Sequence, residues 1–346
     1  MEEITAELNE QKRKVDFNNY DMTVKELISM VGDGLLDIAP EYQRQFRWGE
    51  KRQSALIESI FLGIPVPSLF MATNSNGSWE VIDGVQRLSS IINFAADSLD
   101  RAREKTNLKD PLKLEDLKKL SSFNGYKFSE LPRSIQLDFL LKPIKITTLS
   151  DKSDMSVRFD LFERLNTGGI KLSDQEIRSC IYRGRFNDFI KELSQYENFK
   201  AATKLPNNSE TDGTREELVL RFFAYLNNRE DFDHSVVDFL NSYMELSSKT
   251  FDYKKNEEIF KTIFDKLATL PNGIVKTKTR SITSTIFFEA VTVGAAEAYK
   301  QAGSINIHHF YDWIADKEFN KSITGATNSK PRVKFRIDFC RDKFLE

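Results

Sequence analysis

The stretch WEVIDGVQRLSSIINF, residues 79–94, decides how the first part of this chain folds. Its first half is apolar and β-prone, and its second half carries apolar residues at helical spacing from Val85 to Ile92. The pair Asp83-Gly84 stands where the strand-like run gives way to helical spacing of apolar residues, and glycine suits a tight turn. We therefore predict a strand that ends at Asp83, a turn at Gly84 and an amphipathic helix from Val85.

A hairpin is expected just before this helix. Residues Asn74 to Gly77 are a strong turn signal between two strand-like runs, LFMAT and WEVI. Upstream, TVKELISMVGDG has helical periodicity with Thr23 as its cap. A second helix carries the apolar residues from Leu56 to Phe61 until a glycine and two prolines stop it.

The rest of the chain is predicted to be mostly helical. KPIKITTL, residues 142–149, alternates as a strand does, and Ser173 with Glu176 forms a capping box that predicts a helix start. Beyond about residue 185, apolar residues recur at helical spacing. We predict an α+β protein with three parts: a charged lead-in over residues 1–16, an α/β domain over 17–180 and a helical domain over 181–346.

Composition limits the classes of partner. The 346 residues carry a net charge of -2, so contact with nucleic acid would have to be local. The two cysteines, Cys180 and Cys340, match neither a disulfide framework nor a metal knuckle. The amino terminus lacks the apolar segment of a signal peptide, and no apolar run is long enough to span a bilayer. We expect a cytoplasmic protein without membrane contact.

The turn at Asp83 and Gly84 has the composition of an anion site. A helix amino terminus presents unpaired N–H groups and a partial positive charge, which suit a phosphate. Gly84 would admit the anion to the main chain, and Gln86 and Arg87 could hydrogen-bond it. The Asp83 charge would oppose a bare phosphate unless a divalent cation such as Mg²⁺ bridged the two. The alternative is an ordinary helix capped by Asp83; the chain has neither a Walker motif nor a G-x-G-x-x-G run.

Two other stretches are candidates for ligand contact. In PEYQRQFRW, residues 40–48, arginines alternate with aromatic residues, a pattern that suits phosphate and base stacking. The alternative is that the aromatic residues are core and the arginines pair with local acids. In FERLNTGGIKLS, residues 162–173, a polar turn with two glycines suits a ligand or a sharp corner between helices.

Together these stretches resemble the domain of unknown function 262 family, the GmrS-like domains of bacterial anti-phage restriction systems, which have a ParB/sulfiredoxin-like fold. The matching pieces are PEYQRQFRW, LIESIFLGIPVPSLFM, VIDGVQRLSSIINF and FERLNTGGIKLSDQEIR, in the family's order. The resemblance implies a nucleoside triphosphate (NTP) site with possible Mg²⁺. It implies cofactor-binding roles for Tyr42, Gln43, Arg44, Asp83, Gly84, Gln86, Arg87 and Asn166, with Asp83 and Arg87 as catalytic residues. Val85 stands where the family's usual DGQQR has its first glutamine. This difference weakens the expectation of nucleotide hydrolysis more than that of nucleotide binding.

Three functions follow from these observations. The first is a nucleotide-binding, NTP-hydrolysing sensing subunit of an anti-phage or modified-DNA restriction system, with any nuclease supplied in trans, because no histidine stands in a metal-nuclease setting. The second is a DNA-binding module that uses the basic tail, with Lys330, Arg332, Lys334 and Arg336 as its contacts. The third is a metal-dependent nuclease built on Asp83.

Overall fold

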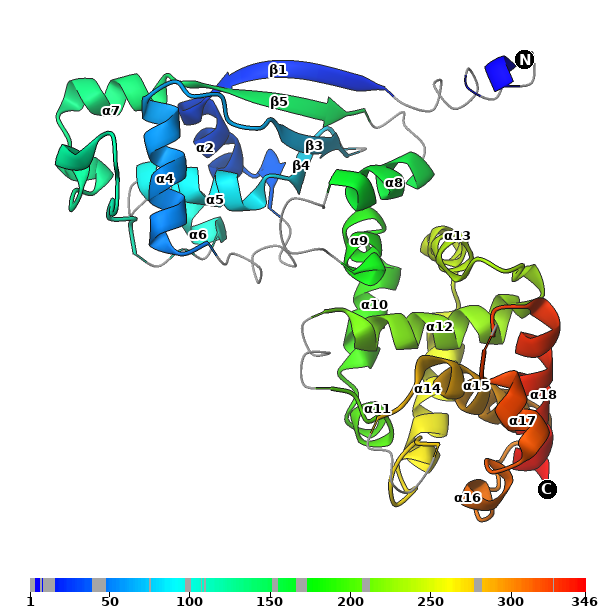
Figure 1. The fold of residues 1–346 in the computed structure, drawn as a ribbon. Coiled ribbons are helices and arrows are strands. Elements are labelled where there is room, and N and C mark those ends of the chain that lie inside the picture. Colours follow the sequence, from blue (N-terminus) through cyan, green and yellow to red (C-terminus); the bar gives the residue numbers. More distant parts are fainter. Residues whose placement is uncertain are drawn as a thin grey trace. The chain divides into compact units, whose positions relative to one another are not determined.

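The computed structural model describes residues 4–6, 8, 16–38, 48–74, 76–96, 101–106, 108, 110–150, 155–165, 173–206, 212–276, 282–325 and 327–346. The chain divides into two compact units, residues 1–171 and 172–346 (Figure 1). The sequence places the boundary at 180/181, one helix later, because the spacing of apolar residues gives no sign of which unit a helix packs against.

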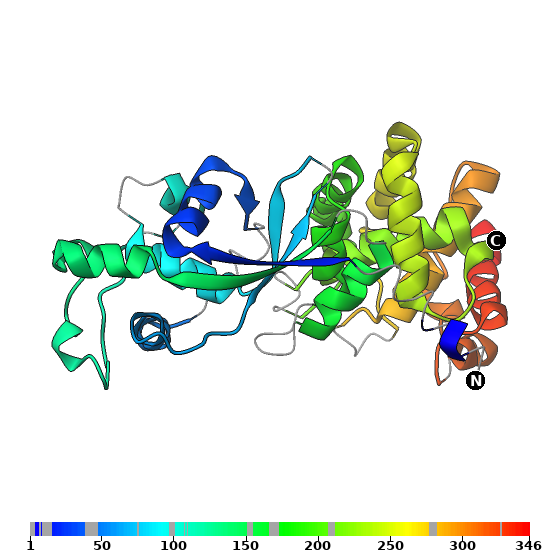
Figure 2. The same ribbon diagram turned by 90° about the horizontal axis from the view of Figure 1, so that it is seen from above.

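Unit 1 is built on one mixed sheet. Among the described residues it has five strands in the order β1-β5-β3-β4-β2. The strands are β1 Phe17–Thr23, β2 Leu36–Asp37, β3 Leu69–Thr73, β4 Trp79–Asp83 and β5 Pro143–Leu149. β1 pairs with β5 and β3 with β4 antiparallel, whereas β3 with β5 and β2 with β4 run parallel. Figure 2 shows β1 and β5 running side by side along the unit. The predicted hairpin and the strand at 142–149 are confirmed.

Helices cover this sheet. They are α2 Val24–Asp33, α4 Glu50–Phe61, α5 Val85–Ala95, α6 Arg101–Thr106, α7 Arg133–Leu140 and α8 Met155–Leu165, with short 3-10 turns η1 Ser121–Phe123 and η2 Phe128–Glu130. The α2 helix begins where the sequence predicts, because the Thr23 hydroxyl accepts from the Glu26 N–H and the Glu26 carboxylate accepts from the Thr23 N–H. It ends at Gly34, which has a left-handed φ of 76°. Phe61, Phe94 and Phe139 pack together where α4, α5 and α7 meet.

Unit 2 is helical throughout its described residues. Its helices are α9 Asp174–Ile181, α10 Arg185–Ser194, α11 Glu197–Ala202, α12 Thr214–Asn228, α13 Val236–Lys249, α14 Tyr253–Leu267, α15 Thr285–Ala302, α16 Phe310–Trp313, α17 Lys317–Ser322 and α18 Lys330–Leu345, with η4 at Arg229–Asp231. The buried α12 packs against α10, α13 and α15. Gly294 brings α15 close to α18: a Cβ there would lie 2.9 Å from the main-chain oxygen of Ile337. The α+β class is confirmed, and the capping box of Ser173 and Glu176 opens α9 as predicted.

Within the described residues, no helix combines the length and the apolar character that a bilayer crossing requires.

Candidate functional site

The turn between β4 and α5 depends on a glycine. β4 ends at Asp83 and α5 begins at Val85, with Gly84 as the helix cap at a φ of 103°. A Cβ on Gly84 would lie 2.3 Å from Cδ2 of Leu69 and 3.2 Å from Nη2 of Arg87. Both the left-handed backbone and the lack of space therefore require glycine here. The strand, turn and helix predicted from residues 79–94 are confirmed.

Asp83 and Arg87 are bonded to each other. Nη2 of Arg87 lies 2.6 Å from Oδ2 of Asp83, and Nη1 of Arg87 donates to the main-chain oxygen of Pro67 at 2.8 Å. The Arg87 side chain is 12% exposed and that of Asp83 is 35% exposed. No side chain caps α5, so the alternative of Asp83 as an ordinary helix cap is wrong. The guanidinium of Arg87 is likewise not free to bind a ligand with its full charge, because Asp83, one helical turn earlier, balances that charge.

The first turn of α5 keeps unused donors. No hydrogen bond within the described chain occupies the main-chain N–H groups of Val85 and Arg87. The Leu88 N–H is the first to bond back, to the oxygen of Gly84 at 2.8 Å. Such groups at a helix amino terminus carry the positive end of the helix dipole. The turn therefore offers two main-chain donors to an anion, beside an internally neutralised carboxylate.

Gln86 links the turn to the end of the stretch PEYQRQFRW. Its Oε1 accepts from the N–H of Trp48 at 3.2 Å, and the oxygen of Trp48 accepts from Nε2 of Gln53 at 2.7 Å. Oε1 of Gln53 in turn accepts from Nδ2 of Asn93 at 2.9 Å, and Nη1 of Arg103 donates to the oxygen of Asn93 at 3.0 Å. The sequence did not predict this series of hydrogen bonds from Gln86 to Arg103. The available signal was a polar residue on the inward face of each helix, since Gln53 lies in α4 and Asn93 in α5.

Four of the predicted nucleotide contacts cannot be placed. Tyr42, Gln43, Arg44 and Asn166 lie outside the described residues. The structure thus brings together Asp83, Gly84, Gln86 and Arg87 at one turn, with Trp48 beside them.

The basic tail forms helix α18, and its four predicted DNA contacts have different surroundings. Arg336 is fully buried and lies 2.7 Å from Oε2 of Glu289, so DNA cannot reach it and the expectation for this residue is wrong. Lys330 contacts the main-chain oxygen and the carboxylate of Glu230, and Arg332 donates to the oxygen of Thr324 at 3.1 Å. Lys334 is exposed. The spacing of apolar residues did not reveal that Arg336 is buried, because a charged residue at a core-facing position of a helix does not count as apolar in that pattern.

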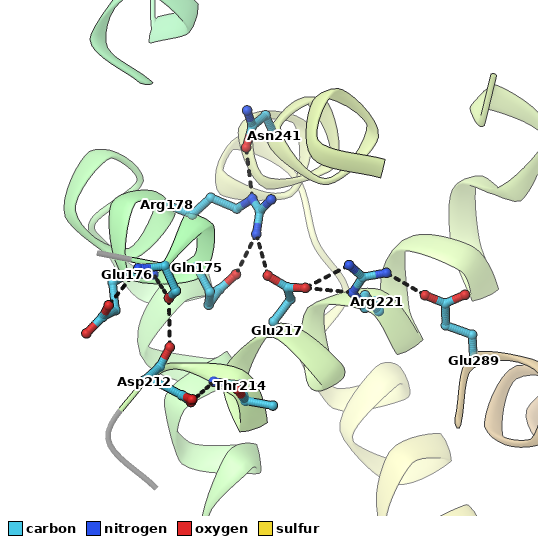
Figure 3. A network of polar contacts seen from close by, with 10 residues as sticks. Gln175, Glu176, Arg178, Asp212, Thr214, Glu217, Arg221, Asn241 and Glu289 are labelled. Atoms are coloured by element: carbon cyan, nitrogen blue, oxygen red, sulfur yellow. Dashed lines mark hydrogen bonds and ion pairs between the residues drawn. The ribbon is translucent and has the colours of Figure 1, made fainter. Parts of the chain in front are cut away.

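Arg336 belongs to a chain of charges that crosses unit 2. Figure 3 shows the part of this chain that runs from Glu289 to Arg178. Glu289 of α15 also lies 2.5 Å from Nη1 of Arg221, and Nη2 of Arg221 lies 2.7 Å from Oε1 of Glu217, both on α12. The other oxygen of Glu217 lies 3.1 Å from Nη1 of Arg178. Burial raises the pKa of Glu217, but the charges of Arg221 and Arg178 outweigh it and the net effect lowers that pKa.

Arg178 closes the stretch FERLNTGGIKLSDQEIR, and its surroundings are structural. It lies on α9, its side chain is buried, and its Nε donates to Oδ1 of Asn241 on α13 at 2.8 Å (Figure 3). Burial is the main cause that lowers its pKa, against the charge of Glu217. Arg178 thereby joins α9 to α12 and α13 and faces the interior of unit 2.

No metal cluster accompanies these residues in the part of the chain that the structure describes, where no three His, Cys, Asp or Glu side chains converge. His309 caps α16, and its Nδ1 lies 3.1 Å from Oδ2 of Asp312, with both side chains exposed. The stretch SINIHHFYDW therefore leads into the short helix α16.

Comparison with protein-family models gives one match: residues 24–183 correspond to the family described as "GmrSD restriction endonuclease, N-terminal domain". These residues are therefore similar to a GmrSD N-terminal domain. The match confirms the resemblance to the domain of unknown function 262 family and indicates a role in a restriction or defence system. Searches of curated proteins and of solved structures gave no significant match. The GmrSD N-terminal domain contains the whole of the Asp83 to Arg87 turn and ends beyond α9.

Proposed function

We propose that this protein is a nucleotide-binding component of a restriction or defence system and that NTP phosphates dock at the amino terminus of α5. The observation that carries the proposal is that the N–H groups of Val85 and Arg87 have no hydrogen-bond partner among the described residues, on a helix that has no side-chain cap. Main-chain donors at such an end bind phosphate well because the helix dipole adds to their hydrogen bonds. The ParB/sulfiredoxin-like fold, which the resemblance implies, stays a prediction.

The Asp83–Arg87 pair makes the site compatible with a polyanion. An isolated carboxylate at this turn would repel phosphate, but Nη2 of Arg87 at 2.6 Å compensates its charge. Arg87 is then a positioning residue that keeps Asp83 neutralised. Oδ1 of Asp83 makes no hydrogen bond within the described chain, so it can offer one oxygen to Mg²⁺, which proteins commonly bind through one or two carboxylates and the substrate phosphates.

The remaining contacts are proposed from the resemblance. Tyr42, Gln43 and Arg44 would flank the phosphates, and Asn166 would close the site from the other stretch. DNA as a further ligand and a nuclease subunit acting in trans are proposals of the same kind. The geometry supports binding more than hydrolysis by a two-metal route, because Asp83 is the one carboxylate at the described turn and it is already paired.

DNA binding through α18 has weaker support. Of its four predicted contacts, Arg336 is buried and Lys330 and Arg332 are bonded within the chain. Lys334 remains as an exposed cation, and a single cation gives little of the affinity that multiple phosphate contacts provide.

The test uses charge cancellation at the turn. Titration of the full chain with ATP and GTP, each without Mg²⁺, is compared with the same titrations of Arg87→Gln and of the double variant Asp83→Asn/Arg87→Gln. Arg87→Gln leaves the Asp83 charge uncompensated and should weaken binding about tenfold, whereas the double variant should recover most of the loss because the turn is neutral again. Equal affinity of all three proteins would overturn the proposal.

A second measurement reports on the main-chain donors directly. In amide NMR spectra, the resonances of Val85 and Arg87 should shift when ATP is added, since their N–H groups gain a phosphate acceptor. Asp83→Asn alone separates the two roles of the carboxylate. If Asp83 serves Mg²⁺, this variant loses affinity only when magnesium is present; unchanged amide resonances in the wild-type protein would contradict docking at α5.

A further inference from the structure

A cavity lies at the carboxyl-terminal end of α5, opposite the proposed phosphate site. It has a volume of about 810 Å³, and it is lined along α2, by the last residues of α5, by the start of α6 and by η2 and α7. Phe94 and Ala95 line it, whereas the proposed phosphate site is at Val85. Since Phe94 and Ala95 lie at the far end of α5 from Val85, the two sites are about 15 Å apart along its axis. The volume is that of a cleft for a small organic ligand.

Four cations from three segments line this cavity: Lys25 on α2, Arg101 on α6, and Lys127 and Arg133 around η2 and α7. None of them forms an ion pair within the described chain, and Asp33 is the one acid among the lining residues. Some other lysines of unit 1, in contrast, form ion pairs.

Lys51, for example, lies 3.6 Å from Asp116, and Lys142 lies 3.2 Å from Asp138. Four cations therefore outnumber the one acid among the residues that line the cavity, and this excess of positive charge favours an anion.

The cavity also has an aromatic wall. Phe128 is half-buried and its ring packs edge-on against Phe94 at a centroid distance of 5.3 Å. Phe139 supports both rings from behind, at 6.0 Å from Phe128 and 5.3 Å from Phe94. A ring held by two neighbours in this way is a rigid surface on which a flat base can stack. Arginine and lysine around such a surface are the arrangement that nucleotide phosphates and bases require together.

We propose that this cavity binds a nucleotide, either free or as the end of a single nucleic-acid strand, with its phosphates on Lys25, Lys127, Arg101 and Arg133 and its base on Phe128. The site is independent of the proposed phosphate site at the amino terminus of α5. It shares with that site only the helix that separates them.

The experiment titrates the full chain with three probes: ATP, inorganic tripolyphosphate and a thymidine tetranucleotide. The variants are Lys25→Gln/Arg133→Gln, whose side chains are exposed, and Lys142→Gln as the matched control for a cation outside the cavity. The double variant should lose about tenfold in affinity for ATP or the tetranucleotide, with a reduced salt dependence, and the control should be unchanged. The probe that loses more identifies the source, free nucleotide or strand end.

Phe128→Leu isolates the stacking contribution, because it keeps an apolar residue but removes the flat ring. Phe128→Leu should lower the affinity for ATP and leave the affinity for tripolyphosphate unchanged. Circular dichroism and thermal unfolding confirm that each variant is folded. The proposal is overturned if the double variant binds all three probes as the wild-type protein does, or if Phe128→Leu weakens ATP and tripolyphosphate equally.

The two sites give distinct signals. The cavity variant should leave the Val85 and Arg87 amide shifts intact, and Arg87→Gln should leave the cavity affinity intact. If ATP does not shift the amide resonances of Val85 and Arg87 but the Lys25→Gln/Arg133→Gln variant binds more weakly, only the proposed function is contradicted. If ATP shifts those resonances but the double variant binds as the wild-type protein does, only the cavity proposal is contradicted.

Discussion

Nη2 of Arg87 lies 2.6 Å from Oδ2 of Asp83, one helical turn before it, while Nη1 of Arg87 donates to the oxygen of Pro67. One side chain thus ties together the end of β4, the first turn of α5 and the segment before β3. The guanidinium that sequence analysis assigns to a phosphate is engaged in building the turn on which a phosphate could dock.

Arg87→Ala should lower the free energy of unfolding by about 1 to 2 kcal/mol, because it leaves Asp83 and the Pro67 oxygen without their donor. Urea unfolding measures the change. Lys142→Ala is the control, since its partner Asp138 is exposed and the loss there should be below about 0.5 kcal/mol. Equal losses in the two variants would show that Arg87 is not the anchor of this turn.

Glu289→Gln should lower the free energy of unfolding much more than Arg87→Ala does. Glu289 is buried and bonded to both Arg221 and Arg336, so the substitution leaves two guanidinium groups without their shared counter-charge. We expect a loss of about 3 to 5 kcal/mol in urea unfolding. Glu318→Gln breaks an exposed pair with Lys321 and should cost about 0.5 kcal/mol or less. A loss at Glu289 as small as at Glu318 would mean that the charge chain of Figure 3 contributes little.

Gly294→Ala tests the close approach of α15 and α18. The added Cβ would lie 2.5 Å from Cβ of Cys340 and 2.8 Å from the main-chain nitrogen of Arg341, so the helices must separate. We expect a loss of about 1 to 3 kcal/mol by thermal unfolding. Gly49→Ala is the matched control, because its φ is -62° and a Cβ there meets nothing within 4 Å. An unchanged melting temperature at Gly294 would contradict this packing.

Alkaline stability should depend on Tyr182. Burial, followed by the charge of Glu245, raises the pKa of Tyr182 from 10.0 to about 12, against the opposite effect of Arg178. The unfolded chain then releases the Tyr182 proton at lower pH than the folded chain, so stability falls as the pH rises from 10 to 12. Tyr182→Phe should make this decline shallower in pH-dependent urea unfolding. Tyr126→Phe, at an exposed ring, should leave the slope unchanged.

Local patterns in the sequence predicted several elements of unit 1, although not strand β1. The turn signal from Asn74 to Gly77 and the glycine at position 84 act within a few residues, and the hairpin and the start of α5 follow from them. The capping boxes at Thr23 and Ser173 were likewise predictable, because a cap is a bond between residues three apart.

The surroundings of charged side chains were not predictable in this way. Arg336 and Lys334 stand two residues apart on α18, yet one is buried against Glu289 and the other is exposed. The partner that decides between them lies on α15, far along the chain. The cavity at the end of α5 is a similar case, since Lys25 and Arg133 are brought to it by α2 and α7.

The sequence by itself determined the hairpin, the start of α5, the capping boxes, the α+β class and the family resemblance of residues 24–183, because these depend on short-range spacing and on ordered motifs. Only the tertiary structure decided what each charge meets: that Arg87 faces Asp83, that Arg178 and Arg336 are buried, and that four cations at one cavity form no ion pair with the residues that the structure describes. The physical reason is that electrostatic energy depends on distance and burial in space, and residues far apart in sequence supply both.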